Sequence, residues 1–340
     1  MQDPQETVTR VVVIGAGAMG GSMACALARS GAWVEIVDTD SAHVTVIGAD
    51  GLAVENLGEA GPVAAETMPG EGGRADFVVV MTPAFETAKA AQTAAHVLKA
   101  EGSAVSLQNG LGNAEALIDV LGAGRVFMGS TRASADRPAP GRPRITKMDP
   151  TSVGELDGSR SARTRWLADA LTRGGMPAEV TDNIEGVLWS KFIHNCCINA
   201  PSAITGLRMG EVTRVPDLAP IRWQIAEEAL AVARAKGIQL EYPDPVPVMQ
   251  RHVWQKFTKP SMLQHVEQGR LIEIDAINGW LVKEAEALGI DAPVNRIVTA
   301  LARGRALAEH RAQGVIPDYA GMTAQAEAEI QRGERPWEQL

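Results

Sequence analysis

The sequence predicts an α/β protein in which an amino-terminal, doubly wound parallel sheet is followed by an all-helical carboxyl-terminal part. Three observations predict this fold class. Short apolar runs alternate with helical stretches from residue 10 to about 130, which is typical of parallel strands joined by helices. A glycine-rich turn follows the first apolar run directly. From about Asp182 onwards, helical periodicity replaces the strand-like runs.

The individual elements follow from these apolar runs. We predict five strands, at Val11–Ile14, Trp33–Val37, Phe77–Met81, Ala104–Leu107 and Val126–Gly129. The helices between them are predicted at Met19–Arg29, Phe85–Lys99 and Ala114–Leu121. In such a sheet, ligands bind at the carboxyl ends of the strands, so the loops after these ends should meet at one site.

The remainder of the chain divides at about residue 180. Ser130–Asp136 and Ile145–Lys147 predict a hairpin-like edge that closes the first domain, with a turn at Pro138–Pro143. Predicted helices follow at Ile184–Asn199, ended by Pro201, and at Leu218–Lys236, Val246–Thr258, Arg270–Leu288 and Pro293–Ala312. We therefore expect domains at 8–180 and 181–320 and a tail at 321–340, either an arm on a partner subunit or a frayed end.

The glycine-rich turn Gly15-Ala16-Gly17-Ala18-Met19-Gly20 is a G-x-G-x-x-G fingerprint between a strand and a helix. Gly15 allows the tight turn, Gly17 lets a pyrophosphate approach the backbone, and Gly20 lets the helix pack on the sheet. Phosphates are favoured at the helix N-terminus, at Ala18 and Met19, by its N–H groups and dipole. This context predicts a Rossmann domain that binds a dinucleotide.

Asp38 ends the second predicted strand, 18 positions after Gly20. An acid there accepts a hydrogen bond from a ribose 2′-hydroxyl and repels a 2′-phosphate. We therefore expect NAD as cofactor, with NADP as the alternative if neighbouring backbone groups rearrange.

Bulk properties narrow the partners. The formal net charge is −9 and there is no long basic run, which argues against nucleic acid and anionic membranes. Three cysteines without a Cys-x-x-Cys pair and six scattered histidines predict neither a disulfide framework nor a metal site. The polar start of the chain has no apolar signal core, and no apolar run is long enough to span a bilayer. We expect a reduced, cytoplasmic enzyme.

A second constellation lies in the helix predicted from Ile184. Lys191, Asn195 and Asn199 are spaced at i, i+4 and i+8, so they share one face of an otherwise apolar helix. Such groups are costly to bury without partners. They suit a site that binds an anionic substrate and delivers a proton, although a polar interface between domains or subunits explains the spacing equally well.

Four segments together resemble the ketopantoate reductase (2-dehydropantoate 2-reductase) family, over about residues 10–300. They are the Gly15–Gly20 fingerprint, the run Gln108–Asn113, the Lys191 helix, and Ser261–Gln264 followed by Glu273–Gly279. The resemblance implies a Rossmann domain, a helical domain, an active site in the cleft between them and a homodimer. It further implies reduction of a 2-oxo acid to a 2-hydroxy acid.

The resemblance also implies roles for single residues. Lys191 matches the general acid, and Glu273 matches the acid that tunes the site and contacts the cofactor. Asn109 matches the asparagine near nicotinamide and substrate. The substrate-binding positions are matched by Asn195, Asn199 and Ser261.

Four departures from the family pattern bear on specificity. Pro83 stands in place of a common lysine and Asp38 in place of a basic residue, which both agree with NAD. Met209 replaces an asparagine of the pantoate pocket, which makes the pocket less polar. His265 replaces an aspartate and is better explained as a solvent-facing histidine than as a substrate ligand.

The leading hypothesis is an NAD-preferring reductase of a branched 2-oxo acid. An alternative is a catabolic enzyme running in the opposite direction, similar to the D-mandelate dehydrogenases of the same fold. A third hypothesis is a non-catalytic dinucleotide sensor. The presence of Lys191 and Glu273 argues against it, because a sensor does not need a proton donor.

Overall fold

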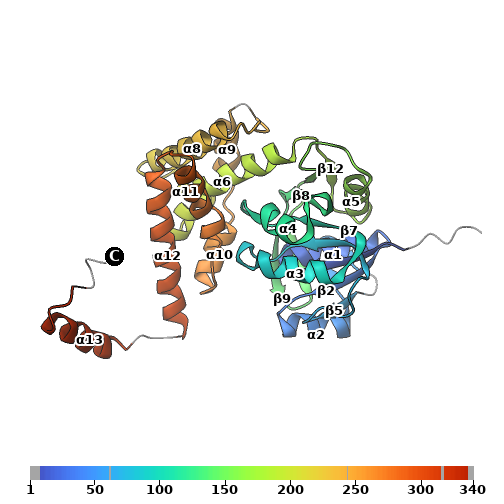
Figure 1. The fold of residues 1–340 in the computed structure, drawn as a ribbon, viewed down its shortest axis with the longest axis horizontal. Helices are drawn as coiled ribbons and strands as arrows, with labels where there is room; N and C mark the ends of the chain where they lie inside the picture. Colours follow the sequence, from blue (N-terminus) through green and yellow to red (C-terminus); the bar gives the residue numbers. More distant parts are fainter. Residues whose placement is uncertain (1–7, 61–62, 243, 315–317, 336–340) are drawn as a thin grey trace, which may run out of the picture.

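The computed structural model describes residues 8–60, 63–242, 244–314 and 318–335. A sheet part and a helical part lie side by side, and the long helix α6 (Ile184–Thr205) extends from one to the other (Figure 1). This architecture confirms the predicted fold class. The first seven residues and the last five of the predicted tail lie outside the described ranges.

The central sheet has eight strands in the order β12-β11-β8-β7-β6-β1-β2-β5. All neighbouring pairs are parallel except β11 and β8. The five predicted strands are confirmed as β1, β2, β6, β7 and β8. The bounds are β1 Arg10–Ile14, β2 Trp33–Val37, β5 Ala64–Glu66, β6 Ala75–Val80, β7 Leu98–Ser106, β8 Val126–Thr131, β11 Thr151–Gly154 and β12 Ala178–Val180.

Alternating side chains of β1 serve two separate cores. Val11 and Val13 are buried with the residues of α1, whereas Val12 and Ile14 are buried with those of α3 and α4. Because helices cover both faces of the sheet, its strands are apolar at consecutive positions. The helices of this part are α1 Ala18–Arg29, α2 Ser41–Asp50, α3 Thr87–Val97, α4 Asn113–Leu121 and α5 Ala162–Arg173, with short 3₁₀ turns η1 Ala84–Glu86 and η2 Ala123–Arg125.

Helices α2 and α5 were missed by the sequence analysis. Each begins with a side-chain cap, in which Asp40 accepts the N–H of His43 and Ser161 accepts that of Thr164. Such caps satisfy backbone donors that a helix start leaves unpaired.

The prediction that a hairpin closes the edge of the first domain was wrong in its placement. β9 (Ser134–Ala139) and β10 (Arg142–Lys147) pair with each other in a separate sheet that packs on α1. The edge next to β8 is occupied by β11 and β12 instead. A second short pair joins β3 (Ala53–Val54) and β4 (Gly58–Glu59).

The helical part surrounds α6. Its other elements are α7 Met209–Val212, α8 Leu218–Ala235, α9 Pro245–Trp254, α10 Ser261–Glu267, η3 Ile274–Ala276, α11 Asn278–Ala287, α12 Pro293–Gly314 and α13 Tyr319–Gln331. Helix α13 lies in the predicted tail and buries none of its residues. Within the described ranges, no helix combines the length and apolarity needed to cross a membrane.

The predicted end of α6 at Pro201 was wrong, because the helix continues through this proline to Thr205 and ends at Gly206. A proline inside a helix costs about 3 kcal/mol. Pro201 and its neighbours Ala200, Ser202 and Ala203 are fully buried, so tertiary packing offsets that cost.

The predicted helix Arg270–Leu288 was also wrong in its first third. A helix forms only from Asn278, after the 3₁₀ turn η3. Glu273 precedes this turn, and its carboxylate accepts the backbone N–H of Ala84 at 2.9 Å. Glu273 therefore contacts the sheet part from a segment that is not α-helical.

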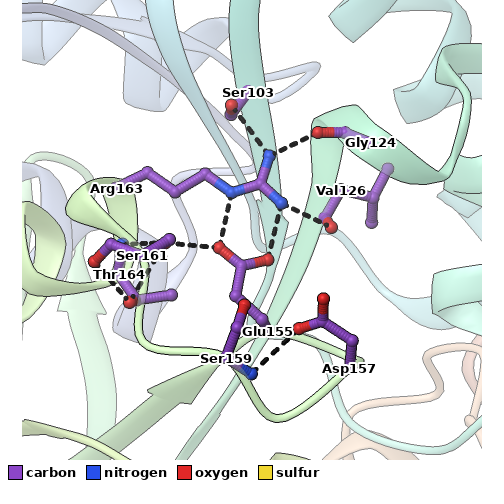
Figure 2. Close-up of polar contacts among 9 residues, drawn as sticks. All are labelled: Ser103, Gly124, Val126, Glu155, Asp157, Ser159, Ser161, Arg163 and Thr164. Carbon is purple, nitrogen blue, oxygen red and sulfur yellow. Dashed lines mark hydrogen bonds and ion pairs between the residues drawn. The ribbon is translucent and has the colours of Figure 1, made fainter.

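One buried ion pair fixes the far edge of the sheet (Figure 2). Arg163 of α5 donates to both oxygens of Glu155, at 2.7 and 2.6 Å, and to the carbonyl oxygen of Gly124 at 2.8 Å. It also donates to Ser103 and to the carbonyl of Val126. This single side chain ties α5 to the end of β11 and to the sheet.

Replacing Arg163 with Met should lower the free energy of unfolding by about 3 kcal/mol, because Glu155 would stay buried without its partner. Denaturant titration measures the change. Arg160→Met is the matched control, since Arg160 pairs with Asp182 on the surface at 3.3 Å, and it should cost less than about 0.5 kcal/mol. Equal losses in the two variants would contradict the assignment.

Candidate active site

The glycine-rich turn after β1 has the geometry that dinucleotide binding requires. Gly15 has φ +88°, and a Cβ there would lie 2.7 Å from the backbone nitrogen of Thr82. A Cβ on Gly20 would lie 2.0 Å from the carbonyl oxygen of Gly15, so only glycine lets α1 pack this closely. At Gly17, by contrast, a Cβ would have no atom within 4 Å, and α1 starts there without a side-chain cap.

The open space at Gly17 fits a pyrophosphate. The first N–H groups of α1, at Ala18 and Met19, begin the helix at this space, where the helix dipole favours negative charge. The residues present are therefore suited to hold the cofactor, as the sequence predicts.

Asp38 has a structural role in addition to the predicted one. Its Oδ2 atom accepts the N–H of Ala16 at 2.6 Å, and its Oδ1 atom accepts that of Asp40 at 2.8 Å. The carboxylate thus holds the glycine-rich turn against the end of β2. A carboxylate has about four acceptor positions, so two remain for ribose hydroxyls.

His43 supports the same turn from beneath and was not identified from the sequence. Its Nδ1 atom accepts the N–H of Gly141 at 2.8 Å, so Nε2 carries the hydrogen and donates to the carbonyl oxygen of Ala16 at 2.7 Å. The ring is completely buried, and burial lowers its pKa. A lone histidine in a helix gives no sequence signal for this contact.

Lys191, Asn109 and Glu273 come together from three distant segments. The Nζ atom of Lys191 donates to Oδ1 of Asn109 at 3.0 Å, and the side chain of Asn109 is hydrogen-bonded to Glu273. The N–H of Ala84, at the start of the turn before α3, holds the same carboxylate. The sheet part supplies Asn109 and Ala84, and the helical part supplies the lysine and the acid.

The electrostatics of this group favour a proton donor near neutral pH. Burial lowers the pKa of Lys191, the charge of Glu273 opposes this effect and that of Arg132 adds to it, so that the pKa is about 8. Burial raises the pKa of Glu273. The hydrogen bonds from the Ala84 N–H and from Asn109, and the charge of Lys191, lower it by a smaller amount. A lysine with such a pKa exchanges its proton readily.

A buried polar network holds Asn109 and Ala84 in place. Gln108 donates from Nε2 to the carbonyl oxygen of Thr82 at 2.9 Å and to the hydroxyl of Thr87 at 2.8 Å. The hydroxyl of Thr87 also lies 2.7 Å from the carbonyl oxygen of Ala84 and 2.9 Å from Oδ1 of Asn113. Asn113 in turn donates to the carbonyl oxygen of Asn109. The sequence analysis named Gln108 and Asn113 only as the ends of a family-like run, and it did not identify Thr87.

The loop that carries Asn109 docks on the helical part at Gly110. This residue has φ +82°, and a Cβ would lie 2.4 Å from the carbonyl oxygen of Ala276. Leu111 donates its N–H to the same carbonyl at 3.3 Å. Glycine is therefore required next to Asn109 both for its conformation and for this close approach.

Asn195, Asn199 and Ser261, the other predicted substrate residues besides Asn109, lie on or beside the helix that carries Lys191. Asn195 and Asn199 follow Lys191 on one face of α6, half-buried and buried, and Ser261 is exposed at the start of α10, which packs on α6. Among the described residues, no hydrogen bond joins these three side chains to Lys191. Their role in substrate binding stays a prediction.

The residues that depart from the family pattern are also placed. Met209 is half-buried, and the Thr258 hydroxyl lies 3.8 Å from its sulfur. His265 is half-buried on α10, and burial lowers its pKa.

A cavity of about 470 Å³ beside α8 and α9, lined among others by Glu227 and Arg234, contains none of the predicted site residues. The described part of the chain holds no group of His, Cys, Asp and Glu side chains that could bind a metal ion.

Comparison with known proteins agrees with this geometry. Residues 11–158 match the family described as ketopantoate reductase PanE/ApbA, and residues 183–306 match its C-terminal domain. The chain belongs to the ketopantoate reductase family. It is therefore an oxidoreductase acting on a CH–OH group, in a family that uses a nicotinamide cofactor.

The match with curated relatives extends over nearly the whole length of each relative. A 2-dehydropantoate 2-reductase of Archaeoglobus fulgidus is 33% identical over 298 residues, 87% of this chain and 98% of the relative. One from Halobacterium salinarum is 30% identical, over 86% of this chain and 98% of the relative.

Solved structures share the fold. The PanE/ApbA family ketopantoate reductase from Ralstonia eutropha JMP134 has a TM-score of 0.80 at 32% identity, over 88% of this chain and 99% of that one. D-mandelate dehydrogenase in complex with NADH and anilino(oxo)acetate has a TM-score of 0.81 at 23% identity, over 88% and 99% of the two chains. At that identity, the second likeness shows the fold alone.

The pKa of Lys191 predicts the pH dependence of the reaction. Reduction needs the protonated amine, so its rate should fall as pH rises through about 8, whereas oxidation of the product should speed up. Glu273→Gln removes the charge that raises this pKa and should move the falling limb to lower pH. Rate profiles over pH 6–10, a range of roughly two pH units on either side of the pKa, measure the pH at which the rate falls.

A matched control is Asp275→Asn, because Asp275 pairs with Arg303 at the exposed surface and its loss should leave the profile in place. An unchanged limb in Glu273→Gln would contradict the assignment.

Lys191→Met should lower turnover by about 10²–10⁴-fold and leave NADH affinity intact.

Proposed function

We propose that the protein is an NAD(H)-preferring reductase that converts a branched 2-oxo acid into the 2-hydroxy acid. The observation that carries the proposal is the contact of the buried Lys191 amine with Asn109, beside the carboxylate of Glu273. The names of the relatives, 2-dehydropantoate 2-reductases, support a 2-oxo acid as substrate.

The site residues account for the protein's share of the chemistry. A bound nicotinamide cofactor supplies the hydride to the carbonyl carbon. As negative charge develops on the carbonyl oxygen, the ammonium group of Lys191 stabilises it and transfers its proton. Asn109 fixes the position of the amine, and Glu273 keeps enough of it protonated near neutral pH. Asn195, Asn199 and Ser261 bind the substrate in this proposal.

The preference for NAD rests on two positions. Asp38 places a carboxylate where a 2′-phosphate would lie, and Pro83 supplies no cation in the following loop. Both features disfavour NADP through charge.

A second candidate runs the same chemistry in reverse, as oxidation of a D-2-hydroxy acid. A pKa of about 8 lets Lys191 accept a proton as well as donate one, and D-mandelate dehydrogenase shares the fold. Membership of the ketopantoate reductase family favours an enzyme, in either direction of the reaction, over a non-catalytic sensor.

Initial rates with NADH and NADPH across ketopantoate, 2-oxoisovalerate and benzoylformate test the function. We expect reduction of a branched acid with NADH faster than with NADPH, and reverse rates with the corresponding hydroxy acids separate the two candidates. Asp38→Asn keeps an oxygen for the N–H of Ala16 but loses the charge, so it should narrow the preference for NADH. A wild-type preference for NADPH would contradict the cofactor proposal, and no turnover with any acid would contradict the reaction.

We also infer a homodimer in the cytoplasm. Ile297 and Leu301, one turn apart on α12, are 58% and 54% exposed, and this pair of apolar side chains on one helix face suits burial against a second copy. The three cysteines are buried thiols, in keeping with a reducing compartment. Light scattering should give twice the mass of the chain, and a monomer mass would contradict the dimer.

A further inference from the structure

Helix α13 lies outside the packed body of its own chain. None of its residues is buried, and Figure 1 shows it apart from both the sheet part and the helical part. The helix is capped by Asp318, which accepts the N–H of Gly321 at 2.9 Å, and it has 13 residues. A helix of this length is only marginally stable in water without tertiary packing. A contact with another molecule would therefore stabilise α13.

The large apolar side chains of α13 share one face, which we call the α13 stripe. Tyr319, Met322 and Ile330 are 61%, 54% and 57% exposed, and helical geometry places them within about 80° around the axis. Glu327 lies on one side of this stripe and Glu329 on the other. Apolar positions between charged edges are typical of a helix that packs along a second helix.

Helix α12 carries a matching surface, which we call the α12 stripe. It consists of Ile297, Leu301, Gly304 and Ala308, which are all exposed and lie within about 60° around the helix axis. From its first residue to its last, this stripe is about 17 Å long, and the α13 stripe has the same length. The two stripes can therefore lie against each other over their full extent.

Gly304, near the middle of the α12 stripe, is not required by the packing of its own chain. A Cβ at this position would have no atom within 4 Å. Glycine inside a helix is less stable than alanine. At an exposed position between apolar residues, the missing side chain lets the backbone of another helix approach closely.

Arginines flank the α12 stripe as glutamates flank the α13 stripe. Arg305 lies on one side, where it forms an exposed ion pair with Glu309 at 2.6 Å, and Arg311 lies on the other side. Among the residues that the structure describes, the Arg311 side chain makes no ion pair or hydrogen bond. The edges of the two stripes thus carry opposite charges, which attract each other when the helices lie side by side.

A second copy of the chain explains why both stripes are exposed in one chain. Helix α13 lies beyond the carboxyl-terminal end of α12 and away from the α12 stripe (Figure 1). If two copies exchange α13 reciprocally, all four stripes are covered and the arrangement closes as a two-fold dimer. The match with the family ends at residue 306, so this contact is an addition to the family's fold.

We propose that α13 docks on the α12 stripe of a second copy of this chain, with Glu327 and Glu329 beside Arg305 and Arg311. The inference rests on the homodimer of the proposed function and specifies the contact that holds it together.

The first test removes α13 by ending the chain at Gly314. Thermal unfolding should be unchanged, because α13 buries none of its residues in its own chain. Sedimentation equilibrium should show a dimer for the full chain, and the dissociation constant should rise about 100-fold or more in the shortened chain, since three large apolar side chains lose their contact.

The outcomes of this test separate the arm from the homodimer. A shortened chain that dimerises as tightly as the full chain would overturn the proposal and leave the homodimer standing, whereas a monomeric full chain would overturn both. Neither result depends on the reductase reaction, so the substrate and cofactor proposals are tested separately.

Single substitutions in the full chain test each stripe. Leu301→Glu and Ile330→Glu should each raise the dissociation constant of the dimer about tenfold or more, because a charge would be buried in an apolar contact. Trp254→Glu is the matched control, since Trp254 is an exposed apolar side chain on α9, outside both stripes, and the constant should change by less than about twofold. A dimer weakened by the control and unaffected by Ile330→Glu would overturn the proposal.

Charge reversal and hydrogen exchange distinguish a second copy from the same chain. Arg305→Glu with Arg311→Glu should weaken the dimer, and adding Glu327→Lys with Glu329→Lys should restore part of the affinity. Backbone hydrogen exchange in α13 should be slow above the dissociation constant and fast after dilution below it. Protection that does not depend on concentration would place α13 on its own chain, and no protection at any concentration would make it a free tail. Either result would overturn the proposal.

Discussion

The partial burial of one ammonium group, that of Lys191, is the constraint on which the site depends. A buried cation is tolerated only with partners, and the partners come from both parts of the molecule: Asn109 from the sheet and Glu273 from the helical part. Because Glu273 also accepts the N–H of Ala84, the contacts that hold the amine are among those that join the two parts. Changes in their relative position must therefore change the pKa of the amine.

Much of the surrounding structure fixes those two partners. Gln108, Thr87 and Asn113 form a buried network that sets the loops bearing Asn109 and Ala84, and Gly110 lets one of these loops dock against Ala276. On the cofactor side, Asp38 and His43 hold the glycine-rich turn. These hydrogen-bonded supports give the reacting groups a defined geometry before any ligand binds.

Charge is distributed unevenly around the amine, and this distribution bears on specificity. Asp38 gives the end of β2 a negative charge and Pro83 adds no cation in the loop after β6, whereas Glu273 and Arg132 shift the pKa of Lys191 in opposite directions. The protein as a whole has a net charge of −9.

The sequence alone determined the five central strands, the dinucleotide turn and the face shared by Lys191, Asn195 and Asn199, because these follow from local periodicity and from glycines with a steric task. It placed the end of α6 at Pro201 and began a helix at Arg270, and both were wrong because burial and the contact of Glu273 with Ala84 outweigh local propensity. Only the tertiary structure decided which side chains meet: the supports Gln108, Thr87 and His43 and the contact of Lys191 with Asn109 involve residues far apart in the chain, and no spacing rule relates them.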